Sequence, residues 1–90
     1  MRFEFDPNKS KSNKKKHEID FVEAQQLWND PDLIEIPSHS LDEERFIVIG
    51  TIVDKNWSAI ITHRDDNIRI ISVRRSRKQE IDIYEKEKSN

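Results

Sequence analysis

The sequence predicts an α+β fold in which an antiparallel meander of about four strands is combined with two N-terminal helices and a C-terminal helix. Four runs rich in β-branched residues follow one another at short intervals between residues 33 and 74, a pattern typical of strands. Short connections join antiparallel neighbours, so the four runs are expected to form one meander. Polar segments with helix-capping signals stand before and after these runs. Ninety residues rarely bury more than one core, and we therefore expect a single domain over residues 1–90.

The N-terminal segment predicts a short strand followed by a polar helix. Phe3 and Phe5 alternate with charged residues, as in a half-buried strand. Asp6 followed by Pro7 is a helix-start signal, because aspartate caps free N–H groups and proline lacks the N–H that would be unpaired there. The helix that follows has almost no apolar face, so its ends and its neighbours must hold it in place.

A second helix is predicted to begin at Asp20. Glu23 follows three residues later, which is the spacing of a capping box. The helix is expected to end at Asn29-Asp30-Pro31, because proline cannot continue it. Its apolar stripe consists of Phe21, Val22, Ala24, Leu27 and Trp28.

The four strand-like runs cover residues 33–36, 45–53, 57–63 and 68–74. The run 45–53 is largely apolar on both faces, which indicates a strand covered on both sides, or one with a partner protein on one face. Strict alternation along the last run sends its residues to two faces. Ile68, Ile70, Ser72 and Arg74 are expected on one face, and Arg69, Ile71, Val73 and Arg75 on the other.

The C-terminal segment predicts a third helix. Ser76 and Gln79 have capping-box spacing, and the helix would continue through Glu80, Tyr84 and Glu87. The alternation of Ile-Asp-Ile-Tyr at 81–84 is compatible with a strand instead.

Composition excludes several classes of function. The chain has no cysteine and three scattered histidines, so neither a thiolate zinc site nor a metal or other cofactor is expected. Its longest apolar runs fall far below the roughly 20 residues of a membrane helix, and the N-terminus lacks the apolar core of a signal peptide. A cytoplasmic protein without membrane contact is expected.

Charge is strongly segregated along the chain although the net charge is only −2. Residues 9–17 hold five lysines and no acid, and residues 69–78 hold five cations and no acid. The segment between them, residues 18–46, holds nine acids and the single base Arg45. A fold that brought the two basic blocks together would create a local anion site in spite of the negative total.

Cations at the end of the last strand are candidates for a phosphate site. Arg74 and Arg75 end the run, and Arg77 and Lys78 stand at the start of the predicted helix. Guanidinium groups beside free backbone N–H donors suit phosphate. The alternative is a solvated charged end that pairs with Glu80, Asp82 or the acidic segment.

Three further side chains are candidates for proton transfer. His17 ends the first basic block, where neighbouring cations favour its neutral form, which a general base needs. His63, followed by Arg64, could face the same edge as Arg74 if the strand ends meet. Tyr84 could place its hydroxyl near the arginines, although packing is the simpler interpretation. Each histidine could equally have no role.

A series of ordered motifs resembles the BrnT family of bacterial toxins over nearly the whole chain. The matching motifs are FEFDPNK (3–9), Asn13, Lys16-His17, FVEA (21–24), Asp30-Pro31, ERFIVIG (44–50) and RIISVRRSRKQEIDIYE (69–85). Phe5, Glu18 and Asp66 depart from the family pattern, which has tryptophan at the first position and glycine at the other two. A left-handed turn occupied by Glu18 or Asp66 would cost roughly 1 kcal/mol.

The resemblance implies a fold similar to the RelE-like ribonuclease toxins, an RNA-cleaving activity that inhibits translation, and a BrnA-type antitoxin that binds the toxin and DNA. On this basis Arg74 and Arg75 would bind the scissile phosphate, and His17 or His63 would take the proton of the ribose 2′-OH without a metal. Tyr84 or a lysine would protonate the leaving oxygen. The RNA-binding candidates are Lys14, Lys15, Lys16, Arg64, Arg69, Arg77 and Lys78. DNA contact is expected only through the antitoxin.

A second hypothesis is a non-catalytic module that docks an antitoxin or another partner. The acidic segment 18–46 favours it, because a basic segment of a partner could lie there.

Overall fold

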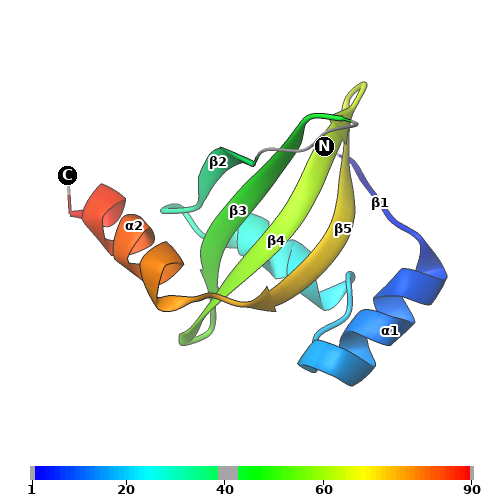
Figure 1. Cartoon of the computed structure of the whole chain (residues 1–90), viewed down its shortest axis with the longest axis horizontal. Helices are drawn as coiled ribbons and strands as arrows, with labels where there is room; N and C mark the ends of the chain where they lie inside the picture. The colour runs from blue at the N-terminus through cyan, green and yellow to red at the C-terminus, as the bar shows by residue number, and fades with distance from the viewer. Residues whose placement is uncertain (1, 39–42, 90) are drawn as a thin grey trace.

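The computed structural model describes residues 2–38 and 43–89 and contains five strands and three helices (Figure 1). The strands are β1 (Arg2–Glu4), β2 (Ile34–Ser38), β3 (Arg45–Ile52), β4 (Lys55–Arg64) and β5 (Asn67–Arg75). The helices are α1 (Pro7–His17), η1 (Glu23–Asn29) and α2 (Lys78–Lys88). The predicted α+β class is confirmed. None of the helices in the described ranges is long and apolar enough to cross a lipid bilayer.

The sheet is mixed and five-stranded, which corrects the prediction of a four-stranded antiparallel meander. The strands β2 to β5 are antiparallel neighbours as expected, but the sheet order is β1-β5-β4-β3-β2 and β1 runs parallel to β5. Phe3 lies opposite Ile68 and meets Trp28 edge to face, with ring centroids 4.8 Å apart. Burial of this aromatic side chain against the core draws the N-terminal strand to the free edge of β5.

The helix α1 begins as the sequence predicts. Asp6 is the N-cap and accepts a hydrogen bond from the backbone N–H of Asn8 at 2.8 Å, and Pro7 occupies the first turn. The helix ends at His17, and the C-cap Glu18 has a left-handed φ of 65°. The second predicted left-handed position is wrong by one residue, because the turn between β4 and β5 has its positive φ at Asp65 and not at Asp66. Glu18 and Asp65 therefore both occupy left-handed conformations, which cost an L-residue about 1 kcal/mol or more.

The second helix differs from the prediction. Asp20 and Glu23 make the reciprocal contacts of a capping box, at 3.0 and 2.7 Å. The helix that follows is nevertheless a 3₁₀ helix of seven residues, η1, and not an α-helix. Only a short segment is available before Asp30-Pro31, and the tighter 3₁₀ geometry is typical of such short pieces.

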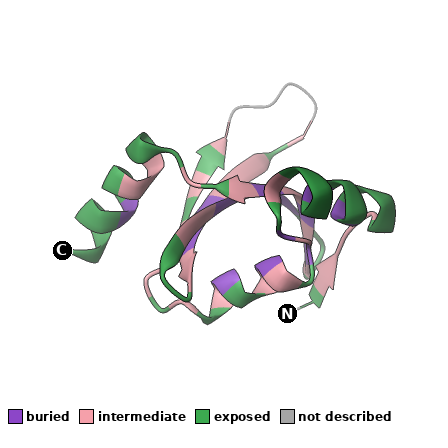
Figure 2. Cartoon of the chain, turned by 90° about the horizontal axis from the view of Figure 1, so that it is seen from below, coloured by how far each residue is buried: buried purple, intermediate pink, exposed green. Residues whose placement is uncertain are grey.

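The core lies between the sheet and η1. Phe21, Ala24 and Leu27 are buried against Val48 and Ala59 of the central strands. In Figure 2 the buried positions of η1 face the sheet. The helix α1 lies at the β5 edge of the sheet. The opposite face is covered at one end by α2, where Tyr84 and Ile49 are buried. The strand β3 is therefore covered on both faces over part of its length, in agreement with its apolar sequence.

A register shift corrects the predicted faces of the last strand. The pairing of β4 with β5 shifts between Ile60 and Ile61, so that Ile60 pairs with Ser72 and Ile61 with Ile70. Ile71 is the extra residue of a β-bulge. Ile68 and Ile70 consequently share the core face with Val73, while Ser72 and Arg74 lie on the other face.

The helix α2 confirms the helical interpretation of residues 81–84, but the predicted cap is wrong. The N-cap is Arg77 and not Ser76, and Glu80, not Gln79, completes the capping box. The Glu80 carboxylate accepts the N–H of Arg77 at 2.8 Å. It also forms an ion pair with Arg74. Neutral Gln79 could not form this charge-assisted contact.

Candidate functional site

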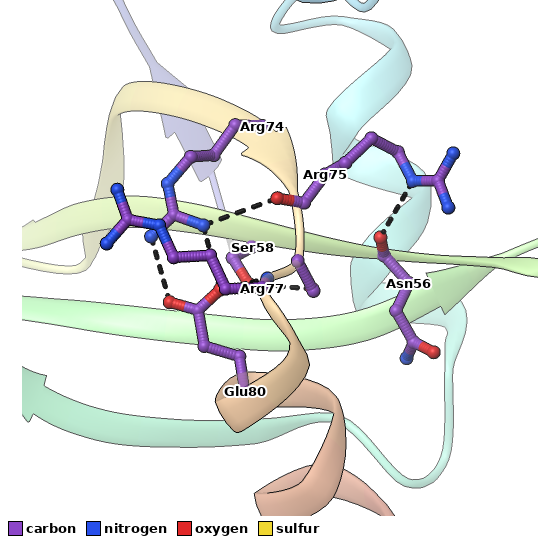
Figure 3. A network of polar contacts seen from close by, with 7 residues as sticks. Asn56, Ser58, Arg74, Arg75, Arg77 and Glu80 are labelled. Carbon is purple, nitrogen blue, oxygen red and sulfur yellow. Dashed lines mark hydrogen bonds and ion pairs between the residues drawn. The ribbon is translucent and has the colours of Figure 1, made fainter.

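The end of β5 presents Arg74 and Arg75 to opposite faces of the sheet, and Arg74 is bound by Glu80. Its two terminal nitrogens donate to the two oxygens of the Glu80 carboxylate, both at 2.8 Å (Figure 3). The same carboxylate accepts the Ser58 hydroxyl at 3.0 Å. The Arg74 guanidinium lowers the pKa of Glu80 to about 2, against burial, with help from the backbone N–H of Arg77 and the Ser58 hydroxyl. The sequence left open whether Arg74 would be free for phosphate or paired with an acid such as Glu80. In the free chain Arg74 is paired with Glu80.

Arg75 lies on the face that carries η1 and is exposed. Its guanidinium carbon is 5.4 Å from the centre of the Trp57 ring. Its Nε donates to the backbone oxygen of Asn56 at 3.3 Å, and Figure 3 shows the terminal nitrogens turned away from that contact. Among the described residues no hydrogen bond or ion pair occupies those nitrogens. Arg75 is thus held at its Nε and over the Trp57 ring, and a guanidinium with open terminal nitrogens has the chemistry to bind an anion such as phosphate.

The last turn of α1 brings the first basic block to the same strand. Asn13 of this helix forms two hydrogen bonds with the backbone of Val73, which precedes Arg74. Lys14 is bound to Glu23 at 2.7 Å, whereas Lys15 and Lys16 are exposed and His17 is half-buried. The helix that carries the first basic block is therefore bound to the strand that ends in Arg74 and Arg75, which is the condition for a local anion site that the charge pattern raised.

His63 is not near Arg74, contrary to the hypothesis that the strand ends meet. It lies opposite Ile68, whereas Arg74 lies opposite Ser58. His63 is five positions beyond Ser58 in β4, which corresponds to about 16 Å along a strand. The His63 ring contacts Glu35 at 3.1 Å and packs against Phe46, with ring centroids 5.1 Å apart.

Arg64 and Arg69 lie at the same distant end as His63. Arg69 pairs with Glu4 at 3.4 Å. Arg64 approaches Glu4 and Glu43, each at 3.8 Å. These two RNA-binding candidates are therefore separated from Arg75 and are neutralised by acids of β1 and of the segment before β3.

Tyr84 is a packed residue whose hydroxyl is bound by Asp30 and Thr51 and not by an arginine. It is 2% exposed, donates to Asp30 at 2.6 Å and accepts from Thr51 at 3.1 Å. Burial raises the pKa of Tyr84, and the Asp30 carboxylate raises it further. The hydroxyl ties α2 to the end of η1 and to β3, in agreement with the packing interpretation. Arg77 and Lys78 are exposed at the start of α2.

Two residues of the site were not identified as such from the sequence. Glu80 appeared as part of a helix, as a possible partner of arginine and as a family position with Tyr84, although glutamate at the third helical position is also a capping signal. Asn13 appeared only as a family position, because its partner Val73 is 60 residues away. Within residues 2–38 and 43–89 no group of three histidine, aspartate or glutamate side chains could hold a metal ion.

The site thus combines a small mixed sheet with a lysine-rich helix docked on the strand that ends in two arginines. The model of the family described as the ribonuclease toxin BrnT of type II toxin-antitoxin systems matches residues 5–80, and the chain belongs to this BrnT family. Membership of such a system implies an antitoxin as partner. No curated protein matches the chain.

Proposed function

We propose that this chain is an endoribonuclease that cleaves RNA through the ribose 2′-OH without a metal ion and thereby inhibits translation. The observation that carries the proposal is the docking of the basic helix α1 on Val73, two residues before Arg75, whose terminal nitrogens are open. Phosphate needs positioned cations, and attack by the 2′-OH needs a base beside them. Both kinds of group are present there.

In this mechanism Arg75 binds the scissile phosphate. His17 takes the proton of the 2′-OH, the 2′ oxygen forms a bond to phosphorus, and the bond from phosphorus to the 5′ oxygen breaks. Lys15 or Lys16 supplies the proton of the leaving 5′ oxygen. We assign the base to His17 and not to His63, because His63 lies at the far end of β4.

Arg74 has a supporting role in the proposal. It is neutralised by Glu80 in the free chain, so RNA meets a guanidinium that is already oriented and has its Nε side free for a second contact. The Tyr84 hydroxyl is an unsuitable proton donor, because it is buried against Asp30.

The antitoxin is proposed to be of the BrnA type, with DNA bound by the antitoxin and not by this chain. A non-catalytic docking module is the second candidate. It is favoured by a groove of about 450 Å³ between β2 and α2, whose apolar lining is Ile34, Ile36 and Ile83. The acidic segment favours it less than its sequence suggested, because Glu23 and Asp30 are engaged within the fold.

The test is incubation of the purified chain, free of any partner, with a defined RNA in EDTA, followed by analysis of the product ends. Wild type is expected to leave 2′,3′-cyclic or 3′-phosphate ends, and Arg75→Ala is expected to lose cleavage. Arg2→Ala removes an exposed arginine at the far end of the sheet and is the matched control. No cleavage by wild type, with or without ribosomes, would transfer the assignment to the docking module.

Growth arrest gives a second test of the site. Expression of the wild-type chain is expected to stop growth, and His17→Ala and Arg75→Ala are each expected to abolish the arrest while antitoxin binding is kept. Full toxicity of both variants would show that the site is assigned to the wrong residues.

A further inference from the structure

The helix α1 is docked on the rest of the molecule by polar atoms instead of an apolar stripe. Its buried residues are Ser10 and Asn13, which are 6% and 7% exposed. The Ser10 hydroxyl accepts the backbone N–H of Phe21 at 2.9 Å. Directed hydrogen bonds tolerate much less displacement than apolar contacts do, so Ser10 and Asn13 each hold the turn of the helix that carries them.

Asn13 pairs with β5 as a strand would. Its Nδ2 donates to the Val73 oxygen at 2.9 Å, and its Oδ1 accepts the Val73 N–H at 3.2 Å. The strand β1 pairs with β5 only at residues 67–69, and the amide of Asn13 continues the pairing further along the same edge. Both backbone groups of Val73 are satisfied in this way, and all three bonds of Asn13 are buried.

The same amide also fixes the turn that carries the basic residues. Nδ2 donates a second bond, at 2.8 Å, to the oxygen of Ile19. Between Asn13 and Ile19 lie the last lysines of α1, His17, and the left-handed Glu18. The two ends of this short loop are therefore joined through one side chain.

Chain direction places this loop at the arginine end of β5. Phe3 lies opposite Ile68 and Asn13 reaches Val73, so the two segments advance in the same direction along the edge. His17 is one helical turn beyond Asn13, about 6 Å further along α1. Arg75 is two residues beyond Val73, about 7 Å further along β5. A displacement of Asn13 would move His17 relative to Arg75.

We propose that Asn13 is a positioning residue for RNA cleavage, which sets the position of His17 relative to Arg75 by clamping α1 to Val73 and the loop to Ile19. This inference rests on the proposed ribonuclease function. Asn13 itself touches neither substrate nor the reacting atoms in this scheme. Its loss is expected to lower kcat, because the base is displaced, and to leave KM nearly unchanged, because Arg75 and the lysines still bind the RNA.

The experiment compares Asn13→Ala with Ser10→Ala. Both variants remove one buried polar anchor of the same helix, so both are expected to lower the melting temperature. Cleavage of a defined RNA is measured at a temperature where all proteins are fully folded. Asn13→Ala is expected to lose at least tenfold in kcat, with KM changed less than twofold, and Ser10→Ala is expected to keep kcat within twofold of wild type.

A second readout does not depend on cleavage. The ring signals of His17 are followed by NMR in all three proteins, and they are expected to change in Asn13→Ala and to stay as in wild type in Ser10→Ala. Equal kcat losses in the two variants, or unchanged His17 signals in Asn13→Ala, would overturn the positioning role. If wild type itself does not cleave RNA, the proposed function fails, and the His17 signals still decide whether Asn13 sets its position.

Asn13→Asp keeps the experiment decisive if Asn13→Ala does not fold. Aspartate preserves the shape of the side chain and the acceptor for the Val73 N–H, but it cannot donate to the oxygens of Val73 and Ile19. Its kcat is expected to fall at least tenfold, and wild-type kcat in this variant would refute the proposal.

Discussion

Replacement of Glu80 by glutamine tests how strongly the arginine of the site is held. The carboxylate accepts hydrogen bonds from Arg74, Ser58 and the N–H of Arg77. Glutamine has nearly the same shape and removes the negative charge, so the variant resembles the wild-type protein with Glu80 protonated. Ser58, the N–H of Arg77 and one nitrogen of Arg74 can still donate to the amide oxygen, whereas Arg74 loses its second hydrogen bond and the opposite charge.

The expected magnitude follows from the pKa of Glu80, which falls from 4.5 to about 2 on folding. Each pKa unit corresponds to about 1.36 kcal/mol, so the ionised carboxylate stabilises the fold by up to about 3 kcal/mol at neutral pH. Because the folded pKa is the lower one, this stabilisation is complete above the unfolded pKa and is lost as the pH falls from about 4.5 towards 2. Wild type is therefore expected to exceed Glu80→Gln most at pH 7, and the two are expected to converge near pH 2.

The assay is denaturant unfolding of both proteins between pH 2 and pH 7, followed by tryptophan fluorescence. Glu85→Gln changes an exposed glutamate of the same helix and is expected to leave the free energy of unfolding within about 0.5 kcal/mol of wild type. A difference between wild type and Glu80→Gln that does not vary with pH would refute the reasoning, because it would show that the ion pair is not the source of the stability.

Two further substitutions test other parts of the structure. Tyr84→Phe removes the hydroxyl that donates to Asp30 and is expected to lower the free energy of unfolding by about 1–2 kcal/mol. RNA cleavage is expected to stay at the wild-type rate. Loss of cleavage by the fully folded variant would show that Tyr84 is a catalytic residue after all. Val53→Gly relieves a β-branched residue at φ 61° that is 92% exposed, so we expect a gain of about 1 kcal/mol in chemical denaturation, and a loss of stability would contradict the strain.

Local signals in the sequence predicted much of the fold. The cap at Asp6, the reciprocal pair of Asp20 and Glu23, and the four antiparallel strands all depend on neighbours close in the chain. The parallel pairing of β1 and the extra residue at Ile71 were missed. Both depend on packing between residues far apart in sequence, and alternation alone contains no information about a bulge.

The candidate site was predicted in part for the same reason. The charge pattern identified Arg74, Arg75 and the lysines of α1, because an excess of one sign is visible without a structure. It did not show that Arg74 is neutralised and Arg75 is open, since the difference depends on which face each side chain reaches. Counting back from the turn at Asp65 would have placed His63 opposite Ile68 and removed it from the site.

The pairing of β1 with β5 has a consequence for the order of folding. Phe3 meets Ile68, and Asn13 meets Val73 across 60 residues, whereas the hairpins of β3, β4 and β5 close over short turns. Long loops close at a higher entropic cost than short ones, so we expect the hairpins to form first and the N-terminal segment to join them last. The basic helix α1 then docks on Val73, near the arginine end of β5, only in the final step, and a chain that has not finished folding does not yet possess the assembled site.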